Sequence, residues 1–421
     1  MNAADLGPVS DADQTQRPFD LFLIFCGANI VATTLQVGAS LVGTLSIGAS
    51  LGLIATGALG GALLVALLAP LGPRLRVPSI IASRAALGLN GAHVLALLLF
   101  VTNFAWIALN NVIAASICSK LLGGDASAPI WAVGLGLVTT VVVTRGPKAV
   151  SYADRWAVPM LFVTGIVLTI ACLRAPLPTT PLATAHATDW WRGLDIVFGY
   201  QVSWLLMFGD YSRYVKSTRG AAVAVFLGLA LTALWFMPLG LLAATIAHSD
   251  DPGTMVFALG LGWWGAILIT LATVTTNFVN IYMSALALKS LRPATGDQLS
   301  VWLIGGLGAA LSVLSKAWLD GFGGLMQVIA GTFVPVGGVL LAHYFVLRRP
   351  VVVSELYDTH GMYARNGGWA IPGMAAWLAG GVAYFLTESI GGVGPSLATS
   401  IGTYLIVSRV IARRIHSSVI T

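Results

Sequence analysis

Long apolar stretches alternate with short polar connections along almost the whole chain. An α-helix needs roughly 20 apolar residues to cross the hydrocarbon core of a bilayer. The stretches that approach or exceed this length are numbered here as spans 1 to 12: Leu21–Leu45, Ala49–Leu71, Ala92–Cys118, Ala128–Val143, Trp156–Leu173, Leu194–Gly209, Ala221–Ala247, Gly265–Leu288, Leu299–Leu314, Gly321–Val346, Trp369–Thr387 and Gly394–Ser408. The pattern predicts an all-α membrane protein with twelve transmembrane helices.

The composition supports lipid as the main solvent of this surface. Only 9% of the 421 residues are charged and 57% are hydrophobic, whereas roughly a quarter of the residues in soluble domains are charged. The net charge of +6 comes from Lys and Arg residues scattered over short connections. No basic stripe with interleaved aromatic residues is present, so we expect no nucleic-acid partner.

The positions of the basic residues orient the predicted spans. With the N-terminus in the cytoplasm, the inner segments hold 18 of the 22 Lys and Arg residues, and the outer segments hold the other four, Lys120, Arg174, Arg192 and Lys316. Cytoplasmic loops carry an excess of Lys and Arg, and one missed span would invert every later loop. The sequence predicts a multi-pass protein of the bacterial inner (cytoplasmic) membrane with both termini cytoplasmic.

Three spans are too polar for helices that only face lipid. Span 1 contains GANIVATTLQVGAS from Gly27, span 6 contains GYQVSWLLMFGDYSRY from Gly199, and span 8 contains LATVTTNFVNIYMS from Leu271. Polar groups at membrane depth are costly unless they line a cavity or bind something. Spans 1 and 6 are five apart, as are spans 3 and 8, which is the spacing of transporters built from two inverted five-helix repeats with broken helices.

Glycines suggest where these spans could unwind. They stand at Gly27, Gly38 and Gly43 in span 1 and at Gly199 and Gly209 in span 6. Unwound backbone would leave carbonyl and N–H groups for a cation and a polar ligand. The alternative is that the small residues allow close helix packing.

Span 3 carries an aromatic and amide face at bilayer depth. Asn103, Trp106 and Asn110 lie three and seven positions apart, which places them on one side of a helix. An indole can stack on a flat heterocycle while amides read its polar edge. Alternatively, Trp106 fills a contact between helices and Asn103 bonds a neighbouring backbone.

Span 8 offers two adjacent hydroxyls, Thr275 and Thr276. Neutral oxygens suit a hard monovalent cation, although Thr hydroxyls in membrane helices often bond their own i−4 carbonyl. The 16 carboxylates lie in the N-terminal tail, in loops or near span ends. A proton relay needs a titratable group at depth, so the pattern favours sodium over protons. Asp20 and Asp195, near helix ends, are the candidates that would support protons.

The chain contains no P-loop, HExxH motif or Ser-His-Asp arrangement, which argues against a nucleotide-driven pump and against an enzyme. A secondary transporter is the function that these features favour. A passive channel or facilitator is the alternative from a different class.

Five segments carry a resemblance to a known family. They are TNFAWIALNN in span 3, GDYSRYVKS after span 6, VTTNFVNIYMSAL in span 8, PVGGVLLAHYFVLRR at the end of span 10 and LYDTHGMYARNGGW in the following loop. Together and in this order they resemble the nucleobase–cation symporter family, which includes the cytosine permease and the hydantoin and hydroxymethylpyrimidine transporters.

The resemblance implies a leucine-transporter-like fold with ten core helices in two inverted repeats and two additional helices. Its segments would be a cytoplasmic tail at 1–20, for which we expect no order, repeats at 21–175 and 190–346, a cytoplasmic loop at 347–368 and two helices with a cytoplasmic tail at 369–421. The implied protein functions as a monomer in the lipid bilayer.

The resemblance also implies two sites. A sodium ion would lie between spans 1 and 8 and would be bound by the carbonyls of Gly27, Ile30 and Ala272 and the hydroxyls of Thr275 and Thr276. The substrate would lie between spans 1, 3, 6 and 8, where its contacts would come from Trp106, Asn103, Asn110, Asn277, Gln201 and Ser203, with Tyr200 or Trp204 as a second ring.

The function that the resemblance implies is sodium symport of a small aromatic heterocycle, such as cytosine, by alternating access. Asn103 stands where the cytosine permease has a longer Gln, and Gln201 stands where that permease has an aromatic ring. The substrate therefore stays open among a nucleobase, a hydantoin or allantoin, and a hydroxymethylpyrimidine or other thiamine precursor. Proton coupling within the same family is the alternative to sodium.

Overall fold

The computed structural model describes residues 7–145, 147–176, 187–291 and 296–420. Over these residues the regular structure is helical, apart from one isolated bridge between Gln16 and Val215. The long helices are α1 (Pro18–Asn29), α2 (Ala32–Ala39), α3 (Ile47–Leu68), α5 (Ser79–Leu122), α6 (Ala128–Thr144), α7 (Pro147–Arg174), α8 (Ala187–Val202), α10 (Thr218–Ala247), α12 (Gly262–Leu291), α13 (Asp297–Leu311), α15 (Phe322–Leu341), α17 (Ile371–Leu386) and α18 (Val393–Ile420). The short helices are α4 (Leu71–Leu75), α9 (Phe208–Ser212), α11 (Pro252–Ala258), α14 (Ser315–Asp320) and α16 (Arg365–Gly368).

Several of these helices are long and apolar enough to cross a membrane. Among the described residues six pass this test alone, and two bent pairs raise the number to eight. The prediction of an all-helical, multi-pass membrane protein is confirmed, whereas the number of twelve spans stays a prediction. Two of the predicted spans enter the count only as bent pairs, and the count covers the described residues alone.

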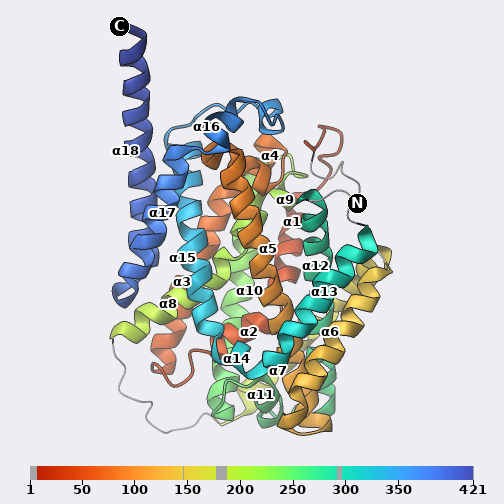
Figure 1. The fold of residues 1–421 in the computed structure, drawn as a ribbon. Helices are drawn as coiled ribbons and strands as arrows, with labels where there is room; N and C mark the ends of the chain where they lie inside the picture. The colour runs from red at the N-terminus through yellow and green to blue at the C-terminus, as the bar shows by residue number, and fades with distance from the viewer. Residues whose placement is uncertain (1–6, 146, 177–186, 292–295, 421) are drawn as a thin grey trace.

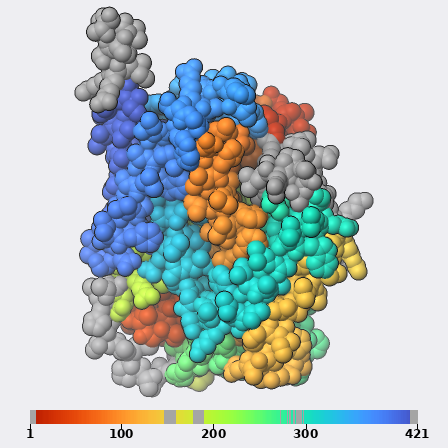
Figure 2. All heavy atoms as spheres, in the orientation of Figure 1, coloured from red at the N-terminus to blue at the C-terminus, as the bar shows by residue number. Residues whose placement is uncertain are grey.

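The surface of the bundle is suited to lipid. In the space-filling view, the orange first half of α5 reaches the surface beside the C-terminal helices (Figure 2). Large apolar side chains there are half exposed, including Leu97 at 53% and Val101 at 55%. Other helices expose Leu303, Leu307 and Leu378 in the same way. Such a surface would be a liability in water and is favourable in hydrocarbon.

Span 1 is broken as predicted. It forms α1 and α2, which are bent by 58°. Val31 is extended, and Ile30 has non-helical angles of φ −84° and ψ 72°. The Thr34 hydroxyl donates a hydrogen bond of 2.6 Å to the carbonyl of Asn29. This bond occupies one of the carbonyls that the end of α1 leaves without an intrahelical partner.

Span 6 is broken as well. Helix α8 ends at Val202, and the chain continues through a turn and a 3-10 segment, η3 (Leu205–Met207), into α9. The Ser203 hydroxyl donates to the carbonyl of Tyr200 at 2.7 Å. The two spans with matching positions in the predicted repeats therefore both lose helical geometry within their length.

The glycines of spans 1 and 6 could either unwind the helices or allow close packing, and their contacts distinguish the two roles. Gly27 lies inside α1, and a side chain at Gly38 would clash with the carbonyl of Met237 on α10. A side chain at Gly199 would clash with the carbonyl of Met326 on α15. Close packing is therefore the role of Gly38 and Gly199. Gly43 has φ +74° in the turn after α2, outside the break.

Residues 7–17 of the N-terminal tail are ordered, contrary to our expectation. Its backbone bonds the ends of the bundle, because Val9 donates to Arg76 at 2.9 Å and Gln16 donates to Tyr214 at 3.1 Å. The buried Gln14 amide donates to the carbonyl of Arg213 at 3.0 Å. These bonds fasten the tail across the connections that follow span 2 and span 6.

The connections gather at two opposite ends of the bundle. Figure 1 shows α4, α9 and α16 toward the upper end and α11 and α14 toward the lower end. The upper helices belong to connections predicted as cytoplasmic, and α11 and α14 belong to connections predicted on the other side. The two sets of connections therefore lie at opposite ends, while the assignment of the upper end to the cytoplasm stays a prediction.

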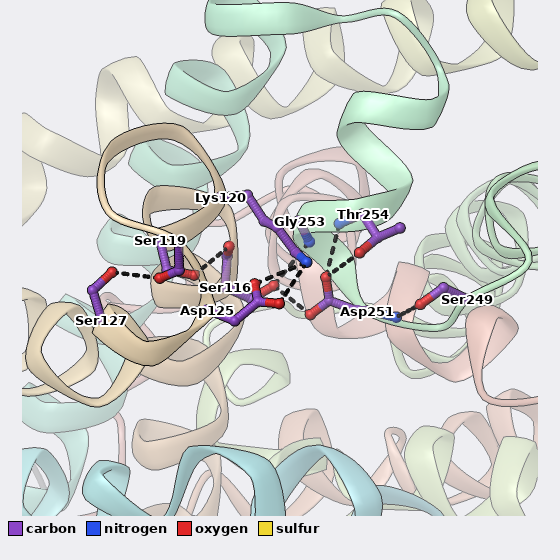
Figure 3. Close-up of polar contacts among 10 residues, drawn as sticks. Ser116, Ser119, Lys120, Asp125, Ser127, Ser249, Asp251, Gly253 and Thr254 are labelled. Atoms are coloured by element: carbon purple, nitrogen blue, oxygen red, sulfur yellow. Dashed lines mark hydrogen bonds and ion pairs between the residues drawn. The ribbon is translucent and has the colours of Figure 1, made fainter.

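A polar cluster fastens α11 to the end of α5 (Figure 3). The Ser116 hydroxyl donates to Asp251 at 2.7 Å and accepts from the Gly253 N–H at 2.9 Å. Asp251 caps α11 by accepting from the Thr254 N–H at 2.8 Å. The Gln36 amide of α2 reaches the same connection and donates to the carbonyl of Asp250 at 3.1 Å. The lower ends of α2 and α5 are therefore held together through α11.

Candidate substrate and ion site

A cavity of about 60 Å³ lies where the breaks in spans 1 and 6 face α5 and α12. Its lining residues are Ala28, Val31, Thr33, Leu99, Asn103, Trp106, Asn110, Tyr200, Ser203, Trp204, Met207, Thr276 and Asn280. All of these side chains are uncharged, and they come from four parts of the chain that are distant in sequence. The cavity therefore brings together the polar segments that the sequence singled out.

Helix α5 presents its predicted face to this cavity. Trp106, Asn103 and Asn110 all line it. The Asn110 amide donates to the carbonyl of Trp106 at 3.0 Å, but its Oδ1 is buried without a hydrogen-bond partner among the described residues. Asn103 is 6% exposed and has no hydrogen bond within the described part of the chain. Buried amides without partners are costly unless a ligand bonds them.

Tyr200 and Trp204, the two candidates for a second ring at the substrate site, both line the cavity, and they differ in role. The Tyr200 hydroxyl lies 2.6 Å from the Thr34 hydroxyl and 3.2 Å from that of Thr33. Its ring stands edge-on to Trp106, with centroids 5.7 Å apart and planes at 83°. The Trp204 Nε1 is buried without a partner among the described residues. Tyr200 ties span 6 to span 1, and Trp204 offers a donor to a ligand.

Helix α12 contributes Thr276 and Asn280, one turn apart. Asn280 was missed in the sequence, although its position four residues after Thr276 places it on the same helical face. Ser203 was predicted and does line the cavity. Further lining residues that the sequence did not indicate are Ala28, Val31, Thr33, Leu99 and Met207.

Two predicted substrate ligands are not brought to the cavity. Gln201 is fully buried, and its Nε2 lies 3.4 Å from the carbonyl of Ala58 and 3.3 Å from that of Leu229. Asn277 donates to Asn111 Oδ1 at 2.7 Å and to the carbonyl of Ile107 at 3.0 Å. Gln201 and Asn277 each follow a cavity-lining residue, Tyr200 or Thr276, by one position. One position is about 100° around a helix, so their side chains point away from the cavity.

Of the predicted cation ligands, Gly27 and Ile30 lie at the break in span 1, and Thr276 of α12 lines the cavity beside it. Because α1 ends at Asn29, the carbonyl of Gly27 falls within the last turn, whose carbonyls have no intrahelical donor, and Ile30 lies in the break. Thr276 shares the cavity lining with Ala28 and Val31, which flank this break. Thr275 is the half-buried neighbour of Thr276. Ala272 is one of the α12 residues whose side chains lie outside the described part.

The two carboxylates that would support proton coupling serve as helix caps. Asp20 accepts a hydrogen bond of 2.9 Å from the Arg17 N–H at the exposed start of α1. Asp195 is fully buried and accepts from the N–H of Gly392 at 2.9 Å, beside the start of α18. Neither carboxylate lines the cavity.

A helical bundle in which two broken spans face one another across a cavity is the arrangement of secondary transporters. The fold agrees with solved structures of this class. Mhp1, described as a nucleobase-cation-symport-1 family transporter, matches in its inward-facing conformation with a TM-score of 0.81 and 18% identity, over 97% of this chain and 94% of that chain. Its closed conformation with bromovinylhydantoin bound matches with a TM-score of 0.77 at the same identity, over 98% and 96% of the two chains.

A more distant fold match is a Na⁺-coupled sialic acid symporter in an outward-open state. The TM-score is 0.61 and the identity 12%, over 96% of this chain and 92% of that chain. Sequence relatives include the cytosine permease of Escherichia coli (strain K12), which is 27% identical over 63% of each chain. The allantoin permease of Bacillus subtilis (strain 168) is 24% identical over 89% of this chain and 85% of its own length.

The family pattern for permeases for cytosine/purines, uracil, thiamine and allantoin matches residues 8–405. The chain belongs to this family of nucleobase–cation symporters, and the resemblance predicted from the five motifs is confirmed. The purine-cytosine permease FCY2 of Saccharomyces cerevisiae (strain ATCC 204508 / S288c) is a further relative, 24% identical over 76% of this chain and 67% of its own.

Proposed function

We propose that the chain imports a small, uncharged aromatic heterocycle by sodium symport, through alternating access. The observation that carries this proposal is the uncharged cavity at the meeting of two broken spans. It combines the Trp106 ring with two buried polar atoms, Asn110 Oδ1 and Trp204 Nε1, that have no hydrogen-bond partner among the described residues. A flat ring with N–H and C=O groups on its edge would satisfy these groups and stack on the indole.

The chemistry of the lining supports a neutral substrate. A carboxylate or ammonium ligand would need a charged partner in such a buried site, and none of the lining residues carries a charge. Asn103, Asn110 and Asn280 can each both donate and accept, which suits rings with mixed edges. We propose a nucleobase such as cytosine as the substrate, with hydantoin or allantoin and thiamine-precursor pyrimidines as the competing rings.

Binding requires the cavity to grow. Pockets for small molecules usually enclose roughly 300–1,000 Å³, well above the 60 Å³ found here. The edge-on contact between Trp106 and Tyr200 closes part of this space. We propose that the incoming ring separates these two side chains and stacks on Trp106, while Tyr200 keeps its bonds to α2.

Sodium is the proposed coupling ion. The break in span 1 supplies carbonyls, and Thr276 supplies a hydroxyl at the same cavity, without any carboxylate in the lining. An ion that bridges span 1 and span 8 would preorganise the substrate pocket, with a coupling free energy of ~1–3 kcal/mol. A membrane potential adds about 2.3 kcal/mol per charge for each 100 mV of inward sodium movement.

The proposed architecture is two inverted repeats at 21–175 and 190–346 within twelve spans, with both termini in the cytoplasm of a bacterial inner membrane. Its support is the pair of breaks in spans 1 and 6 and the collection of Arg-rich connections at one end (Figure 1). Transporters with this plan hold one site at the repeat interface, so a monomer suffices for function.

A thermal-shift panel tests the proposal. Purified protein is heated with cytosine, uracil, adenine, hypoxanthine, allantoin, a hydantoin or hydroxymethylpyrimidine, each in sodium and in choline buffer. A ligand that binds only the folded state raises its apparent stability, so we expect one ring to stabilise the protein in sodium only. Stabilisation that is equal in choline, followed by uptake into proteoliposomes driven by a pH gradient, would replace sodium by protons. Stabilisation by none of the rings would contradict the substrate class.

A further inference from the structure

A second cavity is larger than the proposed substrate site and, unlike it, is lined by charged residues. It has a volume of about 570 Å³ and opens at the end of the bundle that carries α4. Its walls are α4, the π turn η5 (Ala342–Val346) at the end of span 10, and the segment that follows this turn. Its lining residues are Leu71, Arg74, Leu75, Tyr344, Phe345, Arg348, Arg349, Pro350 and Val351. The substrate proposal gives this cavity no role.

Three guanidinium groups line this cavity without acidic partners. The guanidinium groups of Arg74, Arg348 and Arg349 form no ion pair or hydrogen bond within the described residues, and no carboxylate is part of the lining. Elsewhere in the structure, Arg76 pairs with Asp11 at 2.6 Å. The three side chains are exposed, so water and salt screen their mutual repulsion, and an anion bound between them would lower it further.

The backbone beside these arginines is held in an uncommon shape. Arg348 has φ +48°, in the left-handed region that non-glycine residues seldom adopt. It follows the π turn, a distortion that frequently occurs at functional sites. Two hydrogen bonds fix the turn on both sides: the Tyr344 hydroxyl donates to the carbonyl of Ala82 at 2.7 Å, and the His343 ring nitrogen lies 2.6 Å from the Tyr404 hydroxyl. Strained backbone persists only where its surroundings hold it in place.

We propose that this cavity binds an anionic phosphate ester. Guanidinium groups form paired, charge-assisted hydrogen bonds with phosphate oxygens. Three of them favour a phosphate whose negative charge is not neutralised by a cationic group such as choline. The apolar part of the lining, which includes Leu71, Leu75 and Phe345, suits the glycerol and acyl part of a lipid at the membrane boundary. A free phosphate ester from the aqueous side is the other source of the same chemistry. Either ligand would connect α4 to the end of span 10.

Ligand titration with matched variants tests this proposal without any transport substrate. The protein in a neutral detergent is titrated with dioleoylphosphatidylglycerol, with dioleoylphosphatidylcholine, whose phosphate is neutralised by choline, and with glycerol 3-phosphate, and binding is followed by thermal shift and native mass spectrometry. The test variant carries R74Q, R348Q and R349Q. Its matched control carries K216Q, R219Q and R365Q, which remove the same charge from exposed positions outside the cavity.

We expect dioleoylphosphatidylglycerol to bind the protein and the matched control equally, and the test variant roughly 100-fold more weakly, since each arginine near such a surface is worth about fivefold in affinity. The single variant R74Q should bind dioleoylphosphatidylglycerol about fivefold more weakly. It tests the same proposal if the triple variant does not fold. If glycerol 3-phosphate binds as tightly as the lipid, the site takes a soluble phosphate ester. If glycerol 3-phosphate binds much more weakly than the lipid, the site takes the lipid. Equal affinity of the test variant and the unsubstituted protein, or an equal loss in the matched control, would overturn the proposal.

Discussion

Two faces of α12 differ in function although their residues look alike in the sequence. On one face, Thr276 and Asn280 line the cavity. On the other, Asn277 packs into α5 and bonds Asn111, which in turn donates to the Ser312 hydroxyl at 3.0 Å. The first face turns to the cavity, although Asn280 Nδ2 also donates to Asn277 Oδ1 at 3.4 Å, and the second uses its polar atoms to join helices. A polar residue at membrane depth is therefore evidence for a site only when its partners are known.

Span 6 repeats this contrast. Tyr200 and Trp204, one turn apart, face the cavity, whereas Gln201 lies between α3 and α10 and bonds their backbones. In both spans a rotation of about 100° separates a ligand-facing residue from a structural one. The predictions below separate the two faces by experiment.

The largest effect is expected on the cavity face of α5. Trp106→Ala removes the stacking surface and should weaken heterocycle binding roughly 10- to 100-fold, because stacking of a base on an aromatic side chain is worth about 1–3 kcal/mol. Isothermal titration in sodium buffer measures the affinity. Trp264→Ala is the matched control, since this indole is 80% exposed. Unchanged affinity in the Trp106 variant would remove the cavity from consideration as the substrate site.

The two asparagines of α12 should separate stability from binding. Asn277→Ala leaves the Asn111 side chain and the carbonyl of Ile107 without a donor, so we expect a loss of about 2 kcal/mol in stability. Asn280→Ala should lower the affinity for the heterocycle about fivefold with little change in stability, because its bond to Asn277 Oδ1 is long, at 3.4 Å. Thermal unfolding in detergent and ligand titration measure the two quantities. Exchanged effects would mean that the two faces have been assigned the wrong way round.

The sodium requirement should depend on Thr276. Thr276→Ala removes a proposed ligand and should raise the half-saturating sodium concentration about tenfold, which corresponds to about 1.4 kcal/mol. Thr273→Ala is the control on the same helix, because the Thr273 hydroxyl is buried and donates to the carbonyl of Ile269 at 2.7 Å. Sodium dependence is read from ligand-induced thermal shifts over a sodium series. An identical response in both variants would exclude Thr276 as an ion ligand.

The smallest effect is expected at Gln201. Gln201→Leu should leave the affinity within about twofold and change stability by less than about 1 kcal/mol, since its two hydrogen bonds are long and its Oε1 is buried without a partner in the described residues. Trp204 lies on the side of span 6 that faces the cavity. Trp204→Phe should weaken heterocycle binding about fivefold, because the indole N–H is lost. A strong binding defect in the Gln201 variant would show that span 6 rotates before it binds substrate.

Much of the fold was open to prediction from local pattern. Hydropathy predicted the helical membrane bundle, and the spacing of Asn103, Trp106 and Asn110 predicted the face that α5 turns to the cavity. Residue type alone could not locate the helix breaks. Gly38 and Gly199 were open to either role, unwinding or packing, and their contacts with α10 and α15 require a residue without a side chain. A glycine that packs and a glycine that unwinds are identical until the neighbouring helix is known.

The sequence by itself determined the membrane environment, the polar spans and the family, because hydropathy, helical period and motif order are properties of neighbouring residues. Only the tertiary structure decided which of two adjacent polar residues faces the cavity, and it alone assembled the basic cavity from residues 71–75 and 344–351. The physical reason is that a buried polar group is defined by its partners, and these partners come from helices that are distant in the chain.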